Sequence, residues 1–273
     1  MQPTAYSDIG AYDVYNRRMT AAMMDKLFFV DKVPADLFVD FGCADGALIA
    51  HLLQWCPLAR FVGYDVDPQM LAAAKVHLGA AAGDRVVLTD KWDRVREEVE
   101  AARSAGRTTA LVLSSIIHEV YHYSEVREID AFWARALNGG FDFVVVRDMV
   151  PSRGVDRLAD VTDVARVYAK YLHTKELRDF ETRWGSIESN KNLVHWLLKY
   201  QYTSPNWDRE VKENYIPVYR EDLLAMVPRT YDVAYHEHFV LPWLRRCVRR
   251  DFGIELKDQT HLKLVLERVG EKS

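Results

Sequence analysis

The sequence predicts an α/β protein with a seven-stranded, mostly parallel, doubly wound sheet and a helical insertion. Three observations support this prediction. Short apolar runs are separated by segments with helical periodicity. The first run, 37–41, leads through a turn of small residues into a helix at 47–56. The last segment, 260–269, alternates apolar and polar residues, which is typical of an antiparallel closing strand.

The elements follow one another in a regular order. The predicted strands cover 37–41, 60–65, 85–89, 109–115, 141–147, 231–239 and 260–269. The predicted helices cover 12–30, 47–56, a segment from 68, 92–105, a segment after 115, 155–171, 190–202, 208–214, 220–227 and 242–252. This order predicts an N-terminal helical cap (1–36), a nucleotide-binding core (37–149), a helical insertion (150–219) and a C-terminal completion of the sheet (220–273). The insertion begins where ligands bind in such sheets, so we expect it to be a substrate lid.

Composition excludes several classes of protein. The chain has 273 residues and a net charge of -4, which does not suggest a general nucleic-acid binder, although a local basic patch stays open. Its three cysteines form no C-x-x-C pair, so we expect a reducing, cytoplasmic setting. We see no signal peptide and no apolar run of membrane-spanning length, and the sequence does not indicate an oligomeric state.

The turn after the first strand has the pattern of a ligand site. Gly42, Ala44 and Gly46 are small residues at spacing two, and Asp40 precedes them. Such a turn brings backbone N–H groups close to a nucleotide-like ligand. A dinucleotide motif would use Gly42, Ala44 and Ala47 and would lack two of its three glycines. A tight turn without a ligand is the third possibility.

Acidic residues follow the next two strands as well. Asp65 lies about 20 residues beyond the turn, where a carboxylate can accept hydrogen bonds from both ribose hydroxyls. Asp90 follows the third strand. NAD enzymes share the acid at Asp65, but a dinucleotide fold does not require Asp40 or Asp90. The combination favours another nucleotide cofactor.

The segments LFVDFGCADGALIAHLL and GYDVDPQML resemble the first two motifs of class I S-adenosylmethionine (SAM) methyltransferases. The resemblance covers about 37–149 and 220–269 and identifies no narrower subfamily. It implies SAM as cofactor and S-adenosylhomocysteine (SAH) as product. The cofactor contacts it implies are Arg18, Asp40, Gly42, Cys43, Ala44, Gly46, Asp65, Val66, Asp90, Lys91, Trp92 and Ser115.

Within this set, Asp65 would hold the ribose, Val66 would pack on the adenine, and Asp90 would bond the adenine amino group beside Trp92. Asp90 could instead be an ordinary helix N-cap, and Asp67 is expected to cap its helix. Ala44 departs from the family glycine, and it is tolerable if its φ is negative. Arg17 or Arg18 could meet the methionine carboxylate, or both could be solvated.

The candidate catalytic residues are His118, Glu119 and Asp148. In methyltransferases the end of strand four faces the transferred methyl group, so His118 could be a general base or could line the pocket. Glu119 could orient His118 or cap the next helix. Asp148 follows strand five and could accept a proton from the acceptor or hydrogen-bond to it, or it could pair with Arg147 or a lid residue. His118–His122 also forms H-E-x-x-H, but we expect this motif to cross a strand-to-helix junction, which is wrong for zinc.

The candidate substrate residues are Tyr121, Arg147, Trp196 and Tyr200. The insertion holds 11 Lys and Arg against 10 Asp and Glu, together with several aromatic residues. That balance suits a compact acceptor better than an RNA groove. The same aromatic residues are what a small helical subdomain needs for its own core. His236 and His238 share a strand face, but no third metal ligand is evident, and we predict no metal site.

The sequence therefore predicts a methyltransferase acting on an oxygen or nitrogen atom of a small-molecule acceptor. One alternative is an RNA or protein methyltransferase that uses the basic helix with Arg245, Arg246, Arg249 and Arg250, although that helix could simply be solvated. Another is a SAM-binding module without turnover. The sequence leaves open the acceptor, and other uses of SAM remain compatible with the fold.

Overall fold

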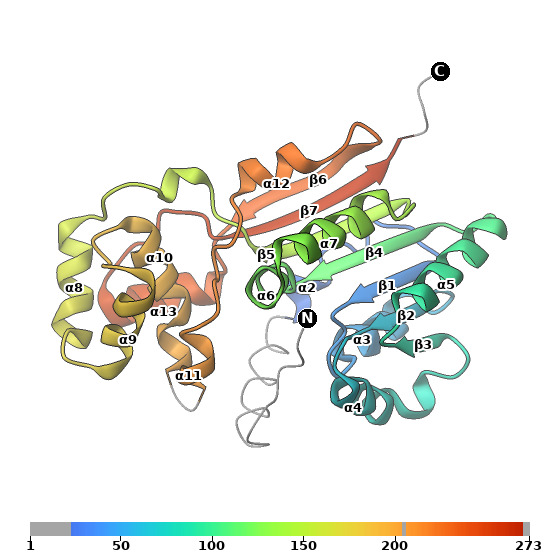
Figure 1. Ribbon diagram of the computed structural model, residues 1–273, viewed down its shortest axis with the longest axis horizontal. Helices are drawn as coiled ribbons and strands as arrows, with labels where there is room; N and C mark the ends of the chain where they lie inside the picture. The colour runs from blue at the N-terminus through green and yellow to red at the C-terminus, as the bar shows by residue number, and fades with distance from the viewer. Residues whose placement is uncertain (1–22, 204–205, 270–273) are drawn as a thin grey trace. The chain divides into compact units, whose positions relative to one another are not determined.

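The fold is organised around one seven-stranded sheet in the order β3-β2-β1-β4-β5-β7-β6 (Figure 1). The computed structural model describes residues 23–203 and 206–269. The strands are β1 (Leu37–Phe41), β2 (Arg60–Tyr64), β3 (Val86–Thr89), β4 (Thr109–Ser114), β5 (Phe143–Met149), β6 (Tyr231–Phe239) and β7 (His261–Arg268). All five residues of β1 are buried, as expected for a central strand that is covered on both faces.

The first five strands are parallel. In β1, Asp40 lies beside Gly63 of β2 and Val112 of β4. β7 runs the other way: Asp142 O accepts from Arg268 N at 2.7 Å, and Val150 N donates to Thr260 O at 3.0 Å. The predicted antiparallel closing strand is confirmed. A dinucleotide-binding sheet has the order 3-2-1-4-5-6 and lacks a strand inserted in this way.

Helices, singly or in groups, alternate with the strands along the chain. They are α2 (Met23–Lys26), α3 (Ala47–Trp55), α4 (Pro68–Leu78), α5 (Trp92–Ser104), α6 (Ile117–Tyr123), α7 (Val126–Asn138), α8 (Val161–Tyr171), α9 (Lys175–Trp184), α10 (Asn190–Lys199), α11 (Trp207–Glu210), α12 (Arg220–Met226) and α13 (Pro242–Phe252). Short 3-10 turns are η1 (Gly79–Ala81), η2 (Arg153–Val155) and η3 (Tyr200–Tyr202).

Alternate residues of β1 show why the sheet is covered twice. Phe38 shares a core with Ile49 of α3 and lies 6.0 Å from Phe29, measured between ring centroids. Phe41 points to the other face, where its ring lies 5.2 Å from that of Phe132 in α7. Because successive side chains of a strand point to opposite faces of the sheet, β1 contributes apolar side chains to a hydrophobic layer on each face.

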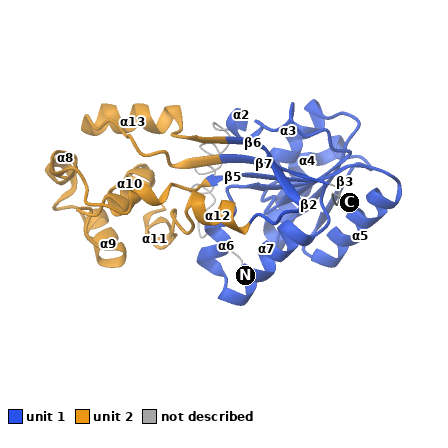
Figure 2. Ribbon diagram, turned by 90° about the horizontal axis from the view of Figure 1, so that it is seen from above, with its two compact units in different colours: residues 1–148, 227–236, 263–273 blue, residues 149–226, 237–262 orange. Residues whose placement is uncertain are grey.

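The chain divides into two compact units (Figure 2). The sheet unit comprises 1–148, 227–236 and 263–273, and the helical unit comprises 149–226 and 237–262. The helical unit has its own core, with Val167, Phe180 and Trp196 at its centre. It includes α12 and α13 as well as the predicted insertion, so it extends beyond residue 219.

Several predicted element boundaries are wrong. The first helix ends at Lys26 rather than residue 30, and residues 12–22 of the predicted helix lie outside the described residues. α8 begins at Val161, where Asp160 caps it by accepting from Thr162 N at 2.8 Å. β5 extends to Met149, so Asp148 lies within the strand.

The predicted helices leave 172–189 unassigned, but α9 forms there. The sequence does carry the signals for that helix: Thr174 accepts from Leu177 N at 3.3 Å as its N-cap, and Gly185 ends it with φ of 92°. α9 buries Leu177 and Phe180.

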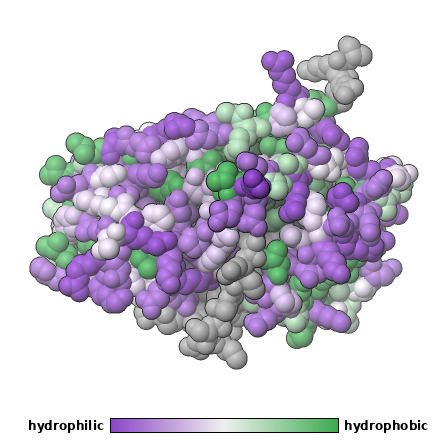
Figure 3. Space-filling model, viewed as in Figure 1, coloured by the Kyte–Doolittle hydropathy of each residue, from purple (hydrophilic) through white to green (hydrophobic). Residues whose placement is uncertain are grey.

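Polar residues cover most of the face seen in Figure 3, interrupted by small apolar patches. The most exposed apolar side chains include Leu58 and Leu158. Within 23–203 and 206–269, no helix has both the length and the apolar character that a bilayer-spanning segment requires.

Candidate active site

The turn after β1 brings its backbone close to the ends of β2 and β4. Gly42 N and Cys43 N both donate to Tyr64 O, at 2.8 and 3.0 Å. Gly42 has φ of 77°, and a Cβ there would lie 2.5 Å from Ile116 Cδ1. Only glycine fits this position. The Cys43 side chain is buried, so a ligand could meet only its backbone.

Ala44 adopts a conformation that disfavours alanine. Its φ is 46°, so the negative φ that would make alanine tolerable here is not observed. Its backbone N donates to Asp65 Oδ2 at 2.9 Å. A left-handed conformation costs a residue with a Cβ roughly 1–2 kcal/mol. The hydrogen bond to Asp65 helps to hold this strained turn in place.

Asp65 links that turn to the start of α4. Its Oδ1 accepts from Asp67 N at 2.9 Å, so the two oxygens serve two segments. Burial raises the pKa of Asp65, against these two backbone hydrogen bonds, which lower it. The residue is only half-buried, and a carboxylate has about four lone-pair sites, so capacity for ligand hydroxyls remains. Asp67 accepts from Gln69 N at 2.8 Å, which confirms the predicted cap.

Asp40 and Lys26 form a buried pair of titratable groups at this edge. Burial raises the pKa of Asp40 to about 7, with Lys26 opposing this and Asp65 adding to it. Burial lowers the pKa of Lys26 to about 8, with a further decrease from Arg147. Lys26 was not among the residues predicted from the sequence. The signal was its place on the apolar face of the helix, three residues after Met23.

The end of β3 carries the predicted adenine side of the site. Asp90 and Lys91 are exposed, and Lys91 rather than Asp90 is the N-cap of α5. The ring of Trp92 lies 5.7 Å from that of Phe41 and 5.4 Å from that of Tyr64. Val66 is half-buried.

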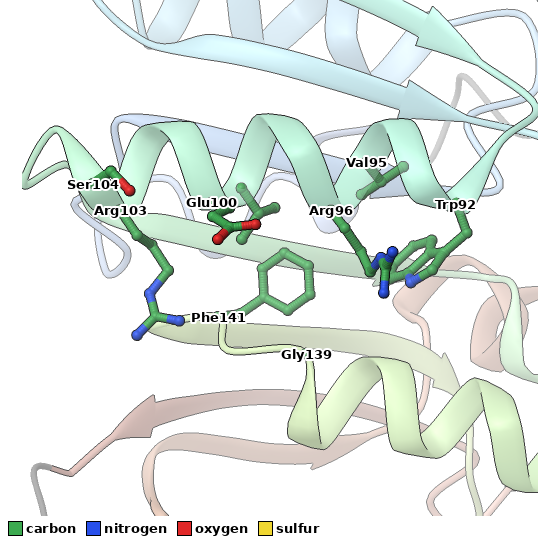
Figure 4. Close-up of a pocket in the computed structure, with 9 residues that line it drawn as sticks. Trp92, Val95, Arg96, Glu100, Arg103, Ser104, Gly139 and Phe141 are labelled. Atoms are coloured by element: carbon green, nitrogen blue, oxygen red, sulfur yellow. The ribbon is translucent and has the colours of Figure 1, made fainter.

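Trp92 also lines one end of a surface pocket of about 510 Å³ along α5 (Figure 4). The pocket continues past Arg96 and Phe141 to Arg103. Of the predicted cofactor residues, Trp92 alone is among those that line it. We therefore place the candidate cofactor site at the strand ends, not in this pocket.

His118 of α6 and Asp148 of β5 form a buried pair. His118 Nδ1 lies 2.9 Å from Asp148 Oδ1, and Asp148 Oδ2 accepts from Ile117 N at 2.7 Å. His118 is 5% exposed and Asp148 is 1% exposed. An ionised carboxylate can only accept, so Nδ1 carries the proton and Nε2 is the nitrogen able to take one.

The remaining catalytic and substrate candidates of the sheet unit have structural contacts. Glu119 is half-buried, and its charge favours the protonated form of Lys26. Tyr121 OH accepts from Trp133 Nε1 at 3.0 Å. Arg147 is buried, pairs with Asp25 at 2.7 Å and donates to Ser115 Oγ at 3.1 Å. Its assignment as a substrate contact stays a prediction.

Trp196 and Tyr200 belong to the core of the helical unit. Trp196 is 0% exposed and packs against Phe180 and Trp207. Tyr200 is 4% exposed, and its hydroxyl donates to Asp251 Oδ2 at 2.7 Å. These side chains stabilise the subdomain, which is the alternative that the sequence had left open, and neither is placed to meet a substrate.

Other predicted features stay outside the site. Arg17 and Arg18 lie outside the described residues. The H-E-x-x-H motif lies inside α6 and does not cross a junction, which corrects our reason for rejecting zinc. Across 23–203 and 206–269, no group of three or more His, Cys, Asp or Glu is arranged to hold a metal ion. The four arginines of α13 are exposed, and Arg250 pairs with its neighbour Asp251.

Comparison with known proteins gives structural likeness alone. No family model matches the sequence, and no curated protein matches it. The methyltransferase domain of bacterial CtHen1-C is 15% identical, with a TM-score of 0.41, over 93% of this chain and 99% of that one. An O-methyltransferase family protein from Burkholderia thailandensis is 16% identical, with a TM-score of 0.45, over 97% of this chain and 62% of that one. The pyocyanin biosynthetic protein PhzM is 18% identical, with a TM-score of 0.46, over 93% and 58%.

The chain thus spans about three fifths of the length of the latter two proteins. Because these identities and TM-scores are low, the fold class rests on the strand order and topology of this chain. Its seven strands follow the order β3-β2-β1-β4-β5-β7-β6, β7 is antiparallel, and a glycine turn follows β1. The fold is that of the class I SAM-dependent methyltransferases.

Proposed function

We propose that this protein is a SAM-dependent methyltransferase that transfers a methyl group to an oxygen or nitrogen atom of a small-molecule acceptor. The observation that carries the proposal is a juxtaposition at one sheet edge. The half-buried carboxylate of Asp65 is bonded to the strained turn and follows β2, and the buried His118–Asp148 pair lies at the carboxyl ends of β4 and β5 in the same parallel part of the sheet. Ligands of open α/β sheets bind at this edge.

The residues present fit SAM. Asp65 would accept from the ribose hydroxyls while keeping its bonds to Ala44 N and Asp67 N. Asp90 is exposed and able to meet an adenine amino group, with Trp92 beside it. Gly42 is half-buried and Ala44 is exposed, so a ligand can approach the turn at these two positions, whereas Gly46 is buried against Leu78 and Ala74. An NAD-type site is disfavoured by the antiparallel β7 and by the acids at Asp40 and Asp90.

When bound, SAM would supply a methyl group on a sulfonium sulfur, and the neutral thioether of SAH would be the leaving group. The protein then has to align the acceptor, exclude water and remove the acceptor proton. His118 would take this proton at Nε2, because Asp148 holds the Nδ1–H and stabilises the imidazolium that forms. The burial of both residues strengthens that interaction.

The experiment is a transfer assay with labelled SAM and a panel of phenols, carboxylic acids and amines. Mass spectrometry would detect an acceptor heavier by one methylene group. We expect His118→Ala to lower turnover by about ten-fold or more without weakening SAH binding. His122→Ala, one helical turn later, is the matched control and should keep turnover.

Two outcomes would contradict the proposal. Unchanged turnover in His118→Ala would remove this residue from the chemistry. Tight SAH binding without a product from any acceptor would instead favour a SAM-binding module. The exposed arginines of α13 have no contact that favours RNA over solvent, so they support no second function.

A further inference from the structure

The turn that carries His118 is strained and has to be held from outside. Ser115, between β4 and α6, has φ of 58°. With Ala44, it is one of two residues other than glycine for which a positive φ is recorded in the described chain. A serine gains nothing from this conformation by itself, so neighbouring groups must impose it. The direction of the chain at Ser115 sets where α6 starts, and His118 is the second residue of α6.

Two consecutive residues of β5 impose this conformation. Arg147 O accepts from Ser115 N at 2.8 Å, and Arg147 Nη1 donates to Ser115 Oγ at 3.1 Å. The next residue, Asp148, accepts from Ile117 N and pairs with His118. Arg147 thus fixes the start of the turn, and Asp148 fixes its end.

The guanidinium of Arg147 is itself aligned by Asp25 of α2. Its Nε and Nη2 both donate to Asp25 Oδ2, at 2.9 and 2.7 Å. Asp25 Oδ1 lies 2.7 Å from Nζ of Lys263 in β7. The Arg147 side chain is 6% exposed, the Asp25 side chain 18% and the Lys263 side chain 12%. One carboxylate therefore joins two largely buried cations, and its loss would leave both without this shared anion.

We propose that Asp25 is a positioning residue for His118 and acts through Arg147 and Ser115. Docking of the α2 segment aligns Arg147, Arg147 holds Ser115 in its left-handed conformation, and the turn then presents His118 to Asp148. The inference rests on the proposed function only in treating His118 as part of the chemistry. Asp25 would thus have a role in the reaction although it lies 122 residues before its partner Arg147 in the sequence.

The test uses the full chain in two variants, Asp25→Asn and Ser115→Ala. Asp25→Asn keeps the side-chain shape but removes the charge. Ser115→Ala removes the hydrogen bond from the Arg147 guanidinium to Ser115 Oγ and leaves the Asp25–Lys263 pair intact. Asp31→Asn is the matched control, because Asp31 is exposed and pairs with its neighbour Lys32. Circular dichroism would verify that each variant is folded.

The main readout is the Nδ1–H resonance of His118 in proton–nitrogen NMR, assigned by its loss in His118→Gln. Since the protein is measured without substrate, this readout does not depend on whether it is a methyltransferase. We expect the resonance to shift or broaden in Asp25→Asn and in Ser115→Ala, and to stay unchanged in Asp31→Asn. The double variant should resemble either single variant, because both changes interrupt the same chain of contacts.

In the transfer assay, Asp25→Asn should lower kcat by about 10-fold to 100-fold with an unchanged SAH dissociation constant, since a misplaced catalytic group costs rate and not cofactor affinity. If Asp25→Asn fails to fold, Ser115→Ala still tests the path, and Asp25→Glu should keep the resonance. Folded Asp25→Asn and Ser115→Ala proteins with the His118 resonance at its original position would overturn the proposal.

Discussion

Replacing Asp148 with asparagine tests how the buried His–Asp pair works. Asp148 is 1% exposed, and each of its oxygens has its own donor, since Oδ2 accepts from Ile117 N and Oδ1 accepts from His118 Nδ1. An asparagine side chain has one acceptor oxygen and one donor NH₂ group. Whichever way the amide is turned, one of the two donors faces another donor.

The two orientations have different costs. If the NH₂ group faces Ile117 N, a buried donor is left unsatisfied, which costs about 1–3 kcal/mol. If it faces His118, the ring has to adopt the other tautomer, and Nε2 then carries a proton and can no longer accept one. The second arrangement removes general base catalysis, which typically contributes about 100-fold to 10,000-fold. We expect kcat to fall within that range and stability to fall by no more than about 3 kcal/mol.

The assay compares kcat and urea unfolding for Asp148→Asn with those for Asp142→Asn. Asp142 joins the same two strands at their other end, where its Oδ2 accepts from Thr109 N at 2.8 Å and from Thr109 Oγ1 at 2.9 Å. The control should lose a similar stability and keep its kcat. Full kcat in Asp148→Asn, or an equal loss of kcat in both variants, would refute this role of the His–Asp pair.

Three further changes probe the cofactor edge. Ala44→Gly should raise the free energy of unfolding by about 1 kcal/mol, because glycine adopts φ of 46° without the penalty of a Cβ. The control Ala72→Gly, on the exposed side of α4, should lower the free energy of unfolding by about 1 kcal/mol. A change of the same sign in both variants, measured by urea unfolding, would contradict backbone strain at Ala44. Asp65→Ala should weaken SAH by about ten-fold or more in calorimetry, since it deletes charge-assisted hydrogen bonds; an unchanged affinity would remove Asp65 from the site. Burial raises the pKa of Asp40 from 3.8 to about 7. Between these pH values the folded state therefore binds up to one more proton than the unfolded state. The free energy of unfolding should then fall as pH rises through that window, by up to about 1.4 kcal/mol per pH unit. Asp40→Asn should abolish this slope in pH-dependent unfolding, and a slope that persists would assign it to other groups.

Local patterns in the sequence predicted the backbone features around the turn after β1. The small-residue turn, Asp65 at the end of β2 and the cap at Asp67 are each set by residues within a few positions of one another, and each lies at the expected place. The backbone of Ala44 was less predictable. Its positive φ depends on the hydrogen bond to Asp65, which is 21 residues away.

The catalytic end depends on contacts between distant segments. His118 and Asp148 are 30 residues apart and meet because β4 and β5 are neighbours in the sheet. Arg147 reads as a substrate contact in the sequence because its partner, Asp25, lies 122 residues earlier. Trp196 reads equally well as pocket or core, since an aromatic residue at helical spacing serves both, and its complete burial decides for the core.

The central claim is that the edge formed by the turn after β1, Asp65 and Asp90 holds SAM. Calorimetric titration of the protein with SAH, SAM and NAD tests it most directly. We predict micromolar binding of SAM or SAH, on the order of -8 kcal/mol, and no binding of NAD. Binding of NAD without binding of SAM or SAH would contradict this claim.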